Sequence, residues 1–263
     1  MTDVLLIGCG RMGGALLKGW RESGAVKSAV VIDPALPTLD GVPVVASLSE
    51  IPDPLPKTIL LAVKPQMLDQ VMPGLAERLP DGALVISIAA GKPISYFADR
   101  LGKPAAIVRT MPNTPAAIGR GITVCCAAPG VTTAERDVAD RLMTAVGEVA
   151  WTEDEALMHA VTAVSGSGPA YVFHLIEALR DAAVAAGLPP DLAARLARAT
   201  VTGAGELAHQ SPDTPEKLRV DVTSPGGTTA AALAVLMGEK GLTDLMTRAV
   251  AAATARSEDL AKG

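Results

Sequence analysis

Residues Val4–Gly14 read VLLIGCGRMGG, an apolar run that leads directly into a glycine-rich turn. The glycines at positions 8, 10 and 13 have the spacing G-x-G-x-x-G, and the helix-forming stretch ALLKGWRES follows them. Glycines permit a tight turn and a close backbone approach, and a helix N-terminus directs free N–H groups at a phosphate. The strand–turn–helix context therefore predicts a dinucleotide site. Its contacts are expected from Ile7, Gly8, Gly10, Arg11, Met12 and Gly13.

An acidic residue follows this turn at a characteristic distance. Asp33 stands twenty residues after Gly13, at the end of the apolar run Ala29–Asp33. A carboxylate in this place accepts hydrogen bonds from both hydroxyls of an adenosine ribose and repels a 2′-phosphate. No Lys or Arg occurs between Lys27 and Lys57, so the local chain offers that phosphate no cation. The residues favour NADH over NADPH; the alternative is that Asp33 only starts the turn at Pro34.

The first part of the chain alternates apolar runs with helical stretches, and the runs are continuous, as in strands that are covered on both faces. Such alternation predicts an α/β fold, a doubly wound sheet with parallel strands joined by crossover helices. The expected strands are Val4–Gly8, Ala29–Asp33, Thr58–Ala62, Ala83–Ser87, Ala106–Thr110, Ile122–Cys126 and Val149–Trp151.

Two loops come after expected strands, at the edge where a ligand would bind. The first loop follows the expected strand Thr58–Ala62 and consists of Ala62, Val63, Lys64 and Pro65. The second follows the next expected strand and consists of Ala89, Ala90 and Gly91. Their small side chains allow the backbone to line a cofactor groove. Lys64 is either a contact to a cofactor phosphate or ribose, or a solvated loop lysine.

Composition limits the classes of function. Hydrophobic residues make up 49% of the 263 residues but aromatics only 2%, so the core must be aliphatic. The net charge of −5, with scattered Lys and Arg, lacks the basic patch that nucleic acids require. No run of about 18 apolar residues is long enough to span a bilayer. We therefore expect no nucleic-acid partner and no membrane partner.

Cysteine and histidine usage bears on the compartment and on metal binding. Three cysteines cannot form a disulfide framework, and an adjacent pair could bridge only with strain; they are Cys9, Cys125 and Cys126. We expect a soluble protein of a reducing compartment, the cytoplasm. The three histidines are far apart and lack metal-ligand spacing, so no metal site is expected.

The strand signal disappears after residue 152. We therefore expect a sheet domain over residues 1–152 and an all-helical domain over residues 153–263. The expected helices are Glu153–Ala163, Ala170–Ala186, Asp191–His209, Pro215–Asp221, Thr228–Gly238 and Thr243–Lys262.

Two familiar chemistries lack their central residues. The 3-hydroxyacid dehydrogenases resemble the first 15 residues of this chain but use a lysine in the long helix after the sheet. No lysine occurs between Lys103 and Lys217. The stretch VSGSGPAY, Val164–Tyr171, fails the nucleophile-elbow pattern G-x-S-x-G because Ser165 occupies the first glycine position.

The helical half is interrupted by VTSPGGTT, Val222–Thr229. Glycines expose the backbone, and the N–H groups of Gly227 and Thr228 open the next helix, an arrangement that holds a carboxylate. A protonated cyclic imine is already electrophilic, so a hydroxyl that orients its nitrogen suffices, and Thr229 is placed to supply one. This pattern favours a cyclic imine acid as the small-molecule substrate.

Over its whole length the chain resembles the pyrroline-5-carboxylate reductases, which catalyse the last step of proline biosynthesis. The resemblance lies in IGCGRMGGAL, AVKPQ, SIAAG, RTMPNTPA, AVSGSGPAYVF and VTSPGGTTAAAL, in that order. It implies an NAD(P)H-dependent imine reductase with an N-terminal Rossmann-type domain and an all-α dimerisation domain. It also implies a homodimer, with dimers that assemble further into rings.

Site roles follow from the same resemblance. Ser224, Gly227 and Thr228 become the carboxylate binders, and Thr229 the partner of the imine nitrogen. The cofactor is expected to contact Ala62–Pro65, Ile88, Ala89, Ala90 and, near the nicotinamide, Asn113.

Three points stay open at the level of sequence. Family resemblance favours NADPH, whereas Ile32-Asp33-Pro34-Ala35 favours NADH, and we follow the residues. Arg219-Val220-Asp221 departs from the Lys-Asp that relatives place before the turn. The alternative functions are reduction of a related cyclic imine acid and a dinucleotide-binding sensor without catalysis.

Overall fold

The computed structural model describes residues 3–36, 38–39 and 41–262. The chain forms two compact units: Met1–Gly166 together with Ala253–Gly263 is unit 1, and Ser167–Ala252 is unit 2. The last strand of the sheet ends at Thr152, which is where the predicted sheet domain ends. The sheet and the compact unit that contains it therefore have different boundaries.

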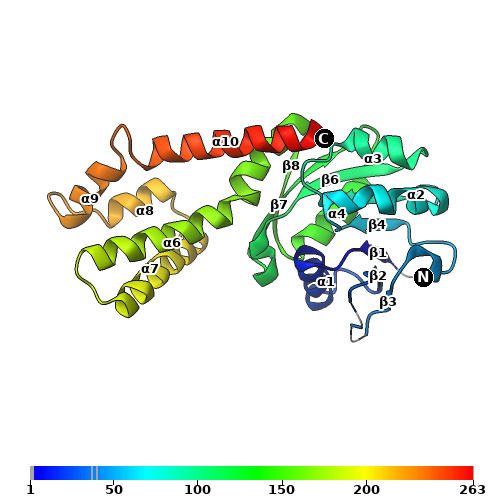
Figure 1. Cartoon of the computed structure of the whole chain (residues 1–263), viewed down its shortest axis with the longest axis horizontal. Coiled ribbons are helices and arrows are strands. Elements are labelled where there is room, and N and C mark those ends of the chain that lie inside the picture. Colours follow the sequence, from blue (N-terminus) through cyan, green and yellow to red (C-terminus); the bar gives the residue numbers. More distant parts are fainter. Residues whose placement is uncertain (1–2, 37, 40, 263) are drawn as a thin grey trace. The chain divides into compact units, whose positions relative to one another are not determined.

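Unit 1 is built on one sheet of strand order β3-β2-β1-β4-β5-β6-β7-β8 (Figure 1). Its strands are β1 (Val4–Ile7), β2 (Ala29–Ile32), β3 (Val44–Val45), β4 (Thr58–Leu61), β5 (Leu84–Ser87), β6 (Ala106–Met111), β7 (Gly121–Ala127) and β8 (Gly147–Thr152). The order reverses at β1, with β2 on one side and β4 on the other. This is the topological switch point at which doubly wound sheets bind ligands.

One strand runs against the prediction. All neighbouring strands are parallel except β6 and β7, which pair antiparallel with Arg109 opposite Cys126. The connection between them, residues 112–120, contains only the short helix η3 (Thr114–Ile118). A parallel crossover needs a dozen or more residues. The expected all-parallel arrangement is therefore wrong at this one pair.

Helices cover both faces of the sheet, which explains the continuous apolar strands. They are α1 (Arg11–Ser23), α2 (Leu68–Arg78), α3 (Ile94–Leu101), α4 (Thr133–Thr144) and α5 (Met158–Val161). Leu5 and Ile7 of β1 pack in one core cluster with residues of α2 and α3. Val4 and Leu6 pack in the other, with residues of α1 and α4. Successive side chains of a strand point to opposite faces, so every position of β1 is buried.

The chain leaves unit 1 through a distorted helix rather than the continuous one predicted over Glu153–Ala163. A 3₁₀ turn η4 (Glu155–Leu157) precedes α5, and the π-helical turn η5 (Thr162–Gly166) follows it. The hydroxyls of Thr162 and Ser165 donate to the carbonyls four residues earlier, over 2.7 and 3.0 Å. Such bonds are typical of locally deformed helices.

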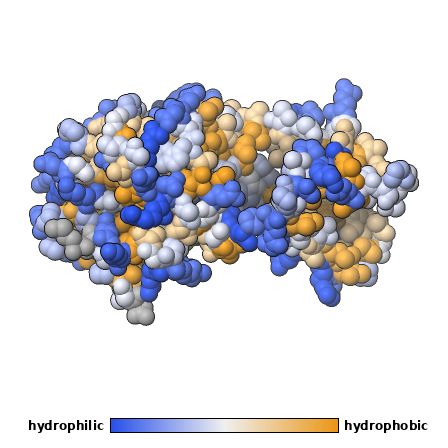
Figure 2. All heavy atoms as spheres, turned by 180° about the vertical axis from the view of Figure 1, so that it is seen from behind, coloured by the Kyte–Doolittle hydropathy of each residue, from blue (hydrophilic) through white to orange (hydrophobic). Residues whose placement is uncertain are grey.

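Unit 2 is helical and exposes much apolar surface. Its helices are α6 (Gly168–Ala185), α7 (Pro190–Gln210), α8 (Pro215–Asp221), α9 (Thr228–Leu236) and the first part of α10 (Leu242–Lys262). No residue of α6 or α9 is buried. Figure 2 shows hydrophobic side chains on the surface of this unit. The exposed large hydrophobic residues of these helices include Phe173, Leu207 and Val235. No helix in the described part of the chain is both long and apolar enough to cross a membrane.

Candidate active site

The three glycines of the first loop meet three different surroundings. Gly8 has φ +92°, and a Cβ there would lie 2.8 Å from backbone atoms of Ala62. A Cβ on Gly13 would overlap the carbonyl oxygen of Gly8. At Gly10 nothing lies within 4 Å of such an atom. Two glycines therefore let the loop pack against its neighbours, and Gly10 leaves one face of the loop open to a ligand.

The helix that follows this loop starts without a side-chain cap. Gly10 is the N-cap of α1, and the first turn contains no acidic residue. By contrast, α4 begins with a capping box in which Thr132 and Glu135 satisfy each other's backbone N–H groups. A helix N-terminus that lacks such partners is free to bind an anion. The geometry of α1 fits a pyrophosphate.

Asp33 lies directly after β2, beside this loop. Its carboxylate accepts the N–H of Cys9 over 2.8 Å and the N–H of Ala35 over 3.0 Å. The second bond closes the local turn that the sequence offered as the alternative reading. Asp33 also lines the cavity described next, so its role in the turn does not prevent a contact with a ligand there.

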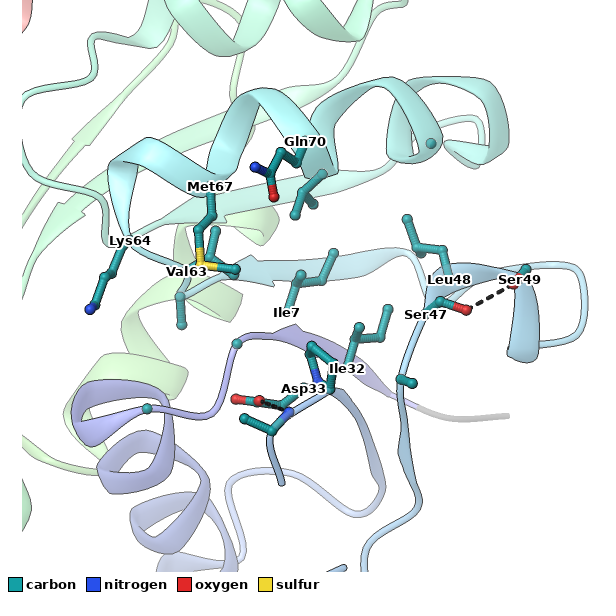
Figure 3. A pocket seen from close by; sticks show the side chains of 18 residues that line it. Ile7, Ile32, Asp33, Ser47, Leu48, Ser49, Val63, Lys64, Met67 and Gln70 are labelled. Atoms are coloured by element: carbon teal, nitrogen blue, oxygen red, sulfur yellow. Dashed lines mark hydrogen bonds between the residues drawn. The ribbon is translucent and has the colours of Figure 1, made fainter. Parts of the chain in front are cut away.

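A cavity of about 610 Å³ opens at this edge of the sheet (Figure 3). Of the residues expected to bind a cofactor, its wall contains Ile7, Gly8, Gly10, Asp33, Ala62, Val63 and Lys64. Among the described residues that line the cavity, Lys64 is the one cation, and it is exposed. In Figure 3, Lys64 lies at the opposite end of the cavity from Ser47.

The other expected cofactor residues lie outside this wall. Arg11, Met12 and Gly13 form the first turn of α1, and Pro65 begins the short helix η2 (Pro65–Met67). Ile88, Ala89 and Ala90 follow β5.

Asn113 follows β6, and its side chain already has a structural partner. It is 9% exposed, and its Oδ1 accepts the N–H of Ile122 over 2.9 Å. This bond spans the connection between β6 and β7, and it leaves the NH₂ group of the side chain for other partners.

Sequence reasoning missed the second half of the cavity wall. Ala46–Ser49 lie after β3, and Met67, Gln70, Val71 and Gly74 belong to or precede α2. Strand β3 has only two residues, too few for a periodic signal. The pattern S-x-x-E at Ser47–Glu50 was a usable signal, because these residues form the capping box of η1 (Leu48–Glu50).

The second expected site lies in unit 2, at the start of α9. Gly226 has φ +68°, which favours glycine, and the N–H of Gly227 donates to the carbonyl of Ser224 over 3.0 Å. Gly227 is the N-cap of α9, with no side-chain cap and no acid in the first turn. Ser224 and Thr228 are exposed, and Thr229 is half-buried. This helix start therefore resembles that of α1, and it fits a carboxylate.

The residues before this turn are bonded to one another. Lys217 and Asp221 form an ion pair within α8. The hydroxyl of Thr223 donates to the carbonyl of Arg219 over 2.6 Å. Asp221 is therefore paired four residues away, which gives a local role to the acid that departs from the family pattern. Among the described residues, no three His, Cys, Asp or Glu side chains gather as metal ligands.

Known proteins match both parts of the chain. Residues 155–260 match the family model for pyrroline-5-carboxylate reductase dimerisation, and residues 3–91 match that for NADP oxidoreductase, coenzyme F420-dependent. The pyrroline-5-carboxylate reductase of Pseudomonas aeruginosa is 39% identical over 267 residues, which cover 98% of this chain and 97% of that protein. This chain belongs to the pyrroline-5-carboxylate reductase family.

Solved structures agree with this assignment. A pyrroline-5-carboxylate reductase from Coxiella burnetii is 34% identical and superposes with a TM-score of 0.91, covering 100% of this chain and 99% of that one. The Plasmodium falciparum pyrroline carboxylate reductase, solved with NADP bound, is 29% identical with a TM-score of 0.84 over 99% and 98% of the chains. The predicted family and fold class are confirmed: an NAD(P)H-dependent oxidoreductase with a Rossmann-type sheet and a helical dimerisation region.

Proposed function

We propose that this chain reduces 1-pyrroline-5-carboxylate to L-proline, the last step of proline biosynthesis. A hydride adds to the carbon of the protonated imine, the C=N π electrons become the lone pair on nitrogen, and the proton already on that nitrogen becomes the N–H of the amine. NAD(P)H supplies the hydride when it is bound. The observation that carries the proposal is the uncapped start of α9 after Ser224-Pro225-Gly226-Gly227, in a chain 39% identical to a reductase of this name.

The substrate roles are proposals from the same turn. The N–H groups of Gly227 and Thr228, with the Ser224 hydroxyl, would hold the carboxylate, because a helix N-terminus favours an anion. The Thr229 hydroxyl would hydrogen-bond the imine nitrogen and orient the ring toward the hydride donor. Orientation of this kind lowers the barrier without a strong side-chain acid.

For the cofactor we propose NADH over NADPH. The support is the Asp33 carboxylate in the cavity wall and the absence of Lys and Arg between positions 27 and 57. Lys64, the one cation among the described lining residues, lies at the end of the cavity away from Ser47. The P. falciparum relative was solved with NADP bound, so the preference has to be measured on this chain.

The test is steady-state oxidation of NADH and NADPH, side by side, with pyrroline-5-carboxylate as the acceptor. We expect turnover with both and a higher kcat/KM for NADH. A higher value for NADPH would overturn the preference and leave the reductase standing. A higher kcat/KM for the six-membered imine acid than for pyrroline-5-carboxylate would favour a related cyclic substrate. Binding of NADH without turnover of either imine would favour a sensor.

We also propose a homodimer in the cytoplasm. The match to the dimerisation model and the exposed apolar side chains of unit 2 support the dimer. All three cysteines are free, which fits a reducing compartment. Family resemblance further suggests a ring of dimers, which sedimentation would reveal as a mass several times that of the dimer.

A further inference from the structure

The Asp33 carboxylate has a second partner far from it in sequence. One oxygen, Oδ1, closes the local turn by accepting the N–H of Ala35 over 3.0 Å. The other, Oδ2, accepts the N–H of Cys9 over 2.8 Å, across 24 positions of the chain. Cys9 is the residue between the first two glycines of the loop. The carboxylate therefore contacts the loop backbone directly.

This bond continues the pairing of two strands beyond their ends. β1 and β2 are parallel, with Ile7 opposite Ile32, and the N–H of Gly8 donates to the carbonyl of Ile32 over 2.8 Å. The side chain of Asp33 then takes the N–H of Cys9, the next donor along the loop. It thereby fixes the peptide between Gly8 and Cys9, one residue before Gly10, the glycine whose open face is proposed for the pyrophosphate.

The opposite end of the same strand pair carries a similar bridge. Asp3, just before β1, accepts the N–H groups of Lys27 and Ser28 through Oδ2, over 3.0 and 3.3 Å. Asp3 also joins the two strands through backbone N–H groups, but it does not line the cavity. It is therefore a matched control for the effect of removing such a carboxylate.

We propose that Asp33 is a positioning residue for the glycine loop, in addition to its proposed contact with the adenosine ribose. The inference rests on the proposed cofactor site. One carboxylate then determines the selectivity between a ribose with a free 2′-hydroxyl and one with a 2′-phosphate, and it also fixes the position of the phosphate-binding backbone. A substitution that removes repulsion of a 2′-phosphate also loosens the loop, so its gain with NADPH is offset by weaker binding of the pyrophosphate.

The first test separates the two roles with a cofactor analogue that lacks both hydroxyls of the adenosine ribose. We expect Asp33→Ala to weaken binding of NADH and of the 2′,3′-dideoxyadenosine analogue, the latter by about tenfold, since a charge-assisted bond is lost. Asp33→Asn, whose carbonyl can still accept the Cys9 N–H, should restore analogue binding to within about threefold. Asp3→Ala, the matched removal at the other end of the strand pair, should change neither. Unchanged analogue binding in Asp33→Ala would overturn the proposal.

The second test needs no cofactor. Amide hydrogen exchange at Cys9 should be about tenfold faster in Asp33→Ala than in the wild type, and close to wild type in Asp3→Ala. If Asp33→Ala does not fold, Asp33→Asn gives the same comparison with a smaller expected change. Equal exchange in folded variants and wild type would overturn the positioning role. Wild-type protein that binds neither NADH nor NADPH would instead refute the proposed function, whatever the exchange rates.

Discussion

Single residues of the glycine loop have separable effects, and Gly10 and Gly13 are a matched pair. Gly13→Ala places a methyl group against the Gly8 carbonyl, so we expect a loss of stability of about 1–3 kcal/mol. Gly10→Ala meets open space, so the melting temperature should stay within about 2 °C. Its methyl group would instead face the pyrophosphate, and the Kd for NADH should rise at least about tenfold. Thermal unfolding and NADH titration of both variants check this pair, and Gly10→Ala with unchanged affinity would contradict it.

Thr229 provides a test of the proposed substrate chemistry. Thr229→Ala removes the hydroxyl, and we expect kcat to fall about 10- to 100-fold while the Kd for NADH stays unchanged. Thr229→Ser keeps the hydroxyl and should retain most of the turnover. Steady-state kinetics and cofactor titration on both variants measure this difference. Equal kcat in Thr229→Ala and the wild type would exclude the assigned role.

The thiol of Cys9 reports on the charge of Asp33. Burial, and secondly the Asp33 carboxylate, raise the pKa of Cys9. The thiolate therefore forms at higher pH than in an ordinary cysteine. Cys125 and Cys126 are buried, and burial raises the pKa of Cys125 to about 12. Cys9 is thus expected to react first with iodoacetamide in the folded protein.

The pH profile of that alkylation shows in which direction the Asp33 charge shifts the pKa of Cys9. Asp33→Asn removes the charge and lowers the pKa of Cys9 part of the way, since burial, the larger cause, remains. The midpoint of the profile should move to lower pH, and the rate at pH 8 should rise. Peptide mapping identifies the alkylated residue. Asp3→Asn should leave the profile in place, and a shift toward higher pH in Asp33→Asn would contradict the electrostatic account.

At the scale of elements, one ion pair joins the sheet to the chain that follows it. Arg109 of β6 is 3% exposed, and its Nη1 lies 2.9 Å from Oε1 of Glu155 in η4. The same oxygen accepts the N–H of Ile94, the first residue of α3, over 2.7 Å. Glu155 therefore connects three elements of unit 1.

Two neighbouring glutamates test the importance of this connection. Glu155→Gln leaves the charge of Arg109 buried and uncompensated, so we expect a loss of about 2 kcal/mol in the free energy of unfolding. Glu153 pairs with Arg136, and its side chain is 76% exposed. Glu153→Gln should therefore cost less than about 1 kcal/mol. Urea denaturation of both variants measures the difference, and equal losses would refute the buried connection.

The elements also show how far sequence reasoning reaches. Most strands and helices were predictable because their apolar patterns are continuous or periodic over a whole element, as in Val4–Ile7 or α7. Strand β3 was not, since Val44–Val45 is set by pairing with Val31 and Ile32 rather than by a local pattern. The direction of β7 was missed because it depends on the length of one connection. The glycine loop and the Ala62–Lys64 side of the cavity were predicted from sequence, whereas the parts of the wall at Ala46–Ser49 and Met67–Gly74 depend on tertiary packing.

At the scale of the whole molecule, the exposed apolar residues of unit 2 indicate a surface that binds a second subunit. Large hydrophobic side chains are exposed along α6, α7 and α9, including Phe173 at 61% and Val235 at 75%. Apolar surface on this scale marks an interaction site. We expect a dimer at micromolar concentration in analytical ultracentrifugation. Phe173→Glu should shift it toward monomer, whereas Ile118→Glu, 77% exposed but outside the matched dimerisation region, should not. A monomeric wild type would contradict the proposal that this surface is a dimer interface.

The return of α10 to unit 1 has a consequence for synthesis on the ribosome. Residues 253–263 are made after all of unit 2, yet they belong to unit 1, where the buried Ser257 hydrogen-bonds His159 over 2.9 Å. Backbone atoms of Leu260 also lie close to Gly91, in the loop after β5. Domains generally fold in the order in which they are translated. Here the nucleotide-binding unit is started first and completed last: the strands of its sheet are all translated by Thr152, but the segment that carries Ser257 and Leu260 follows only after an entire helical unit has emerged.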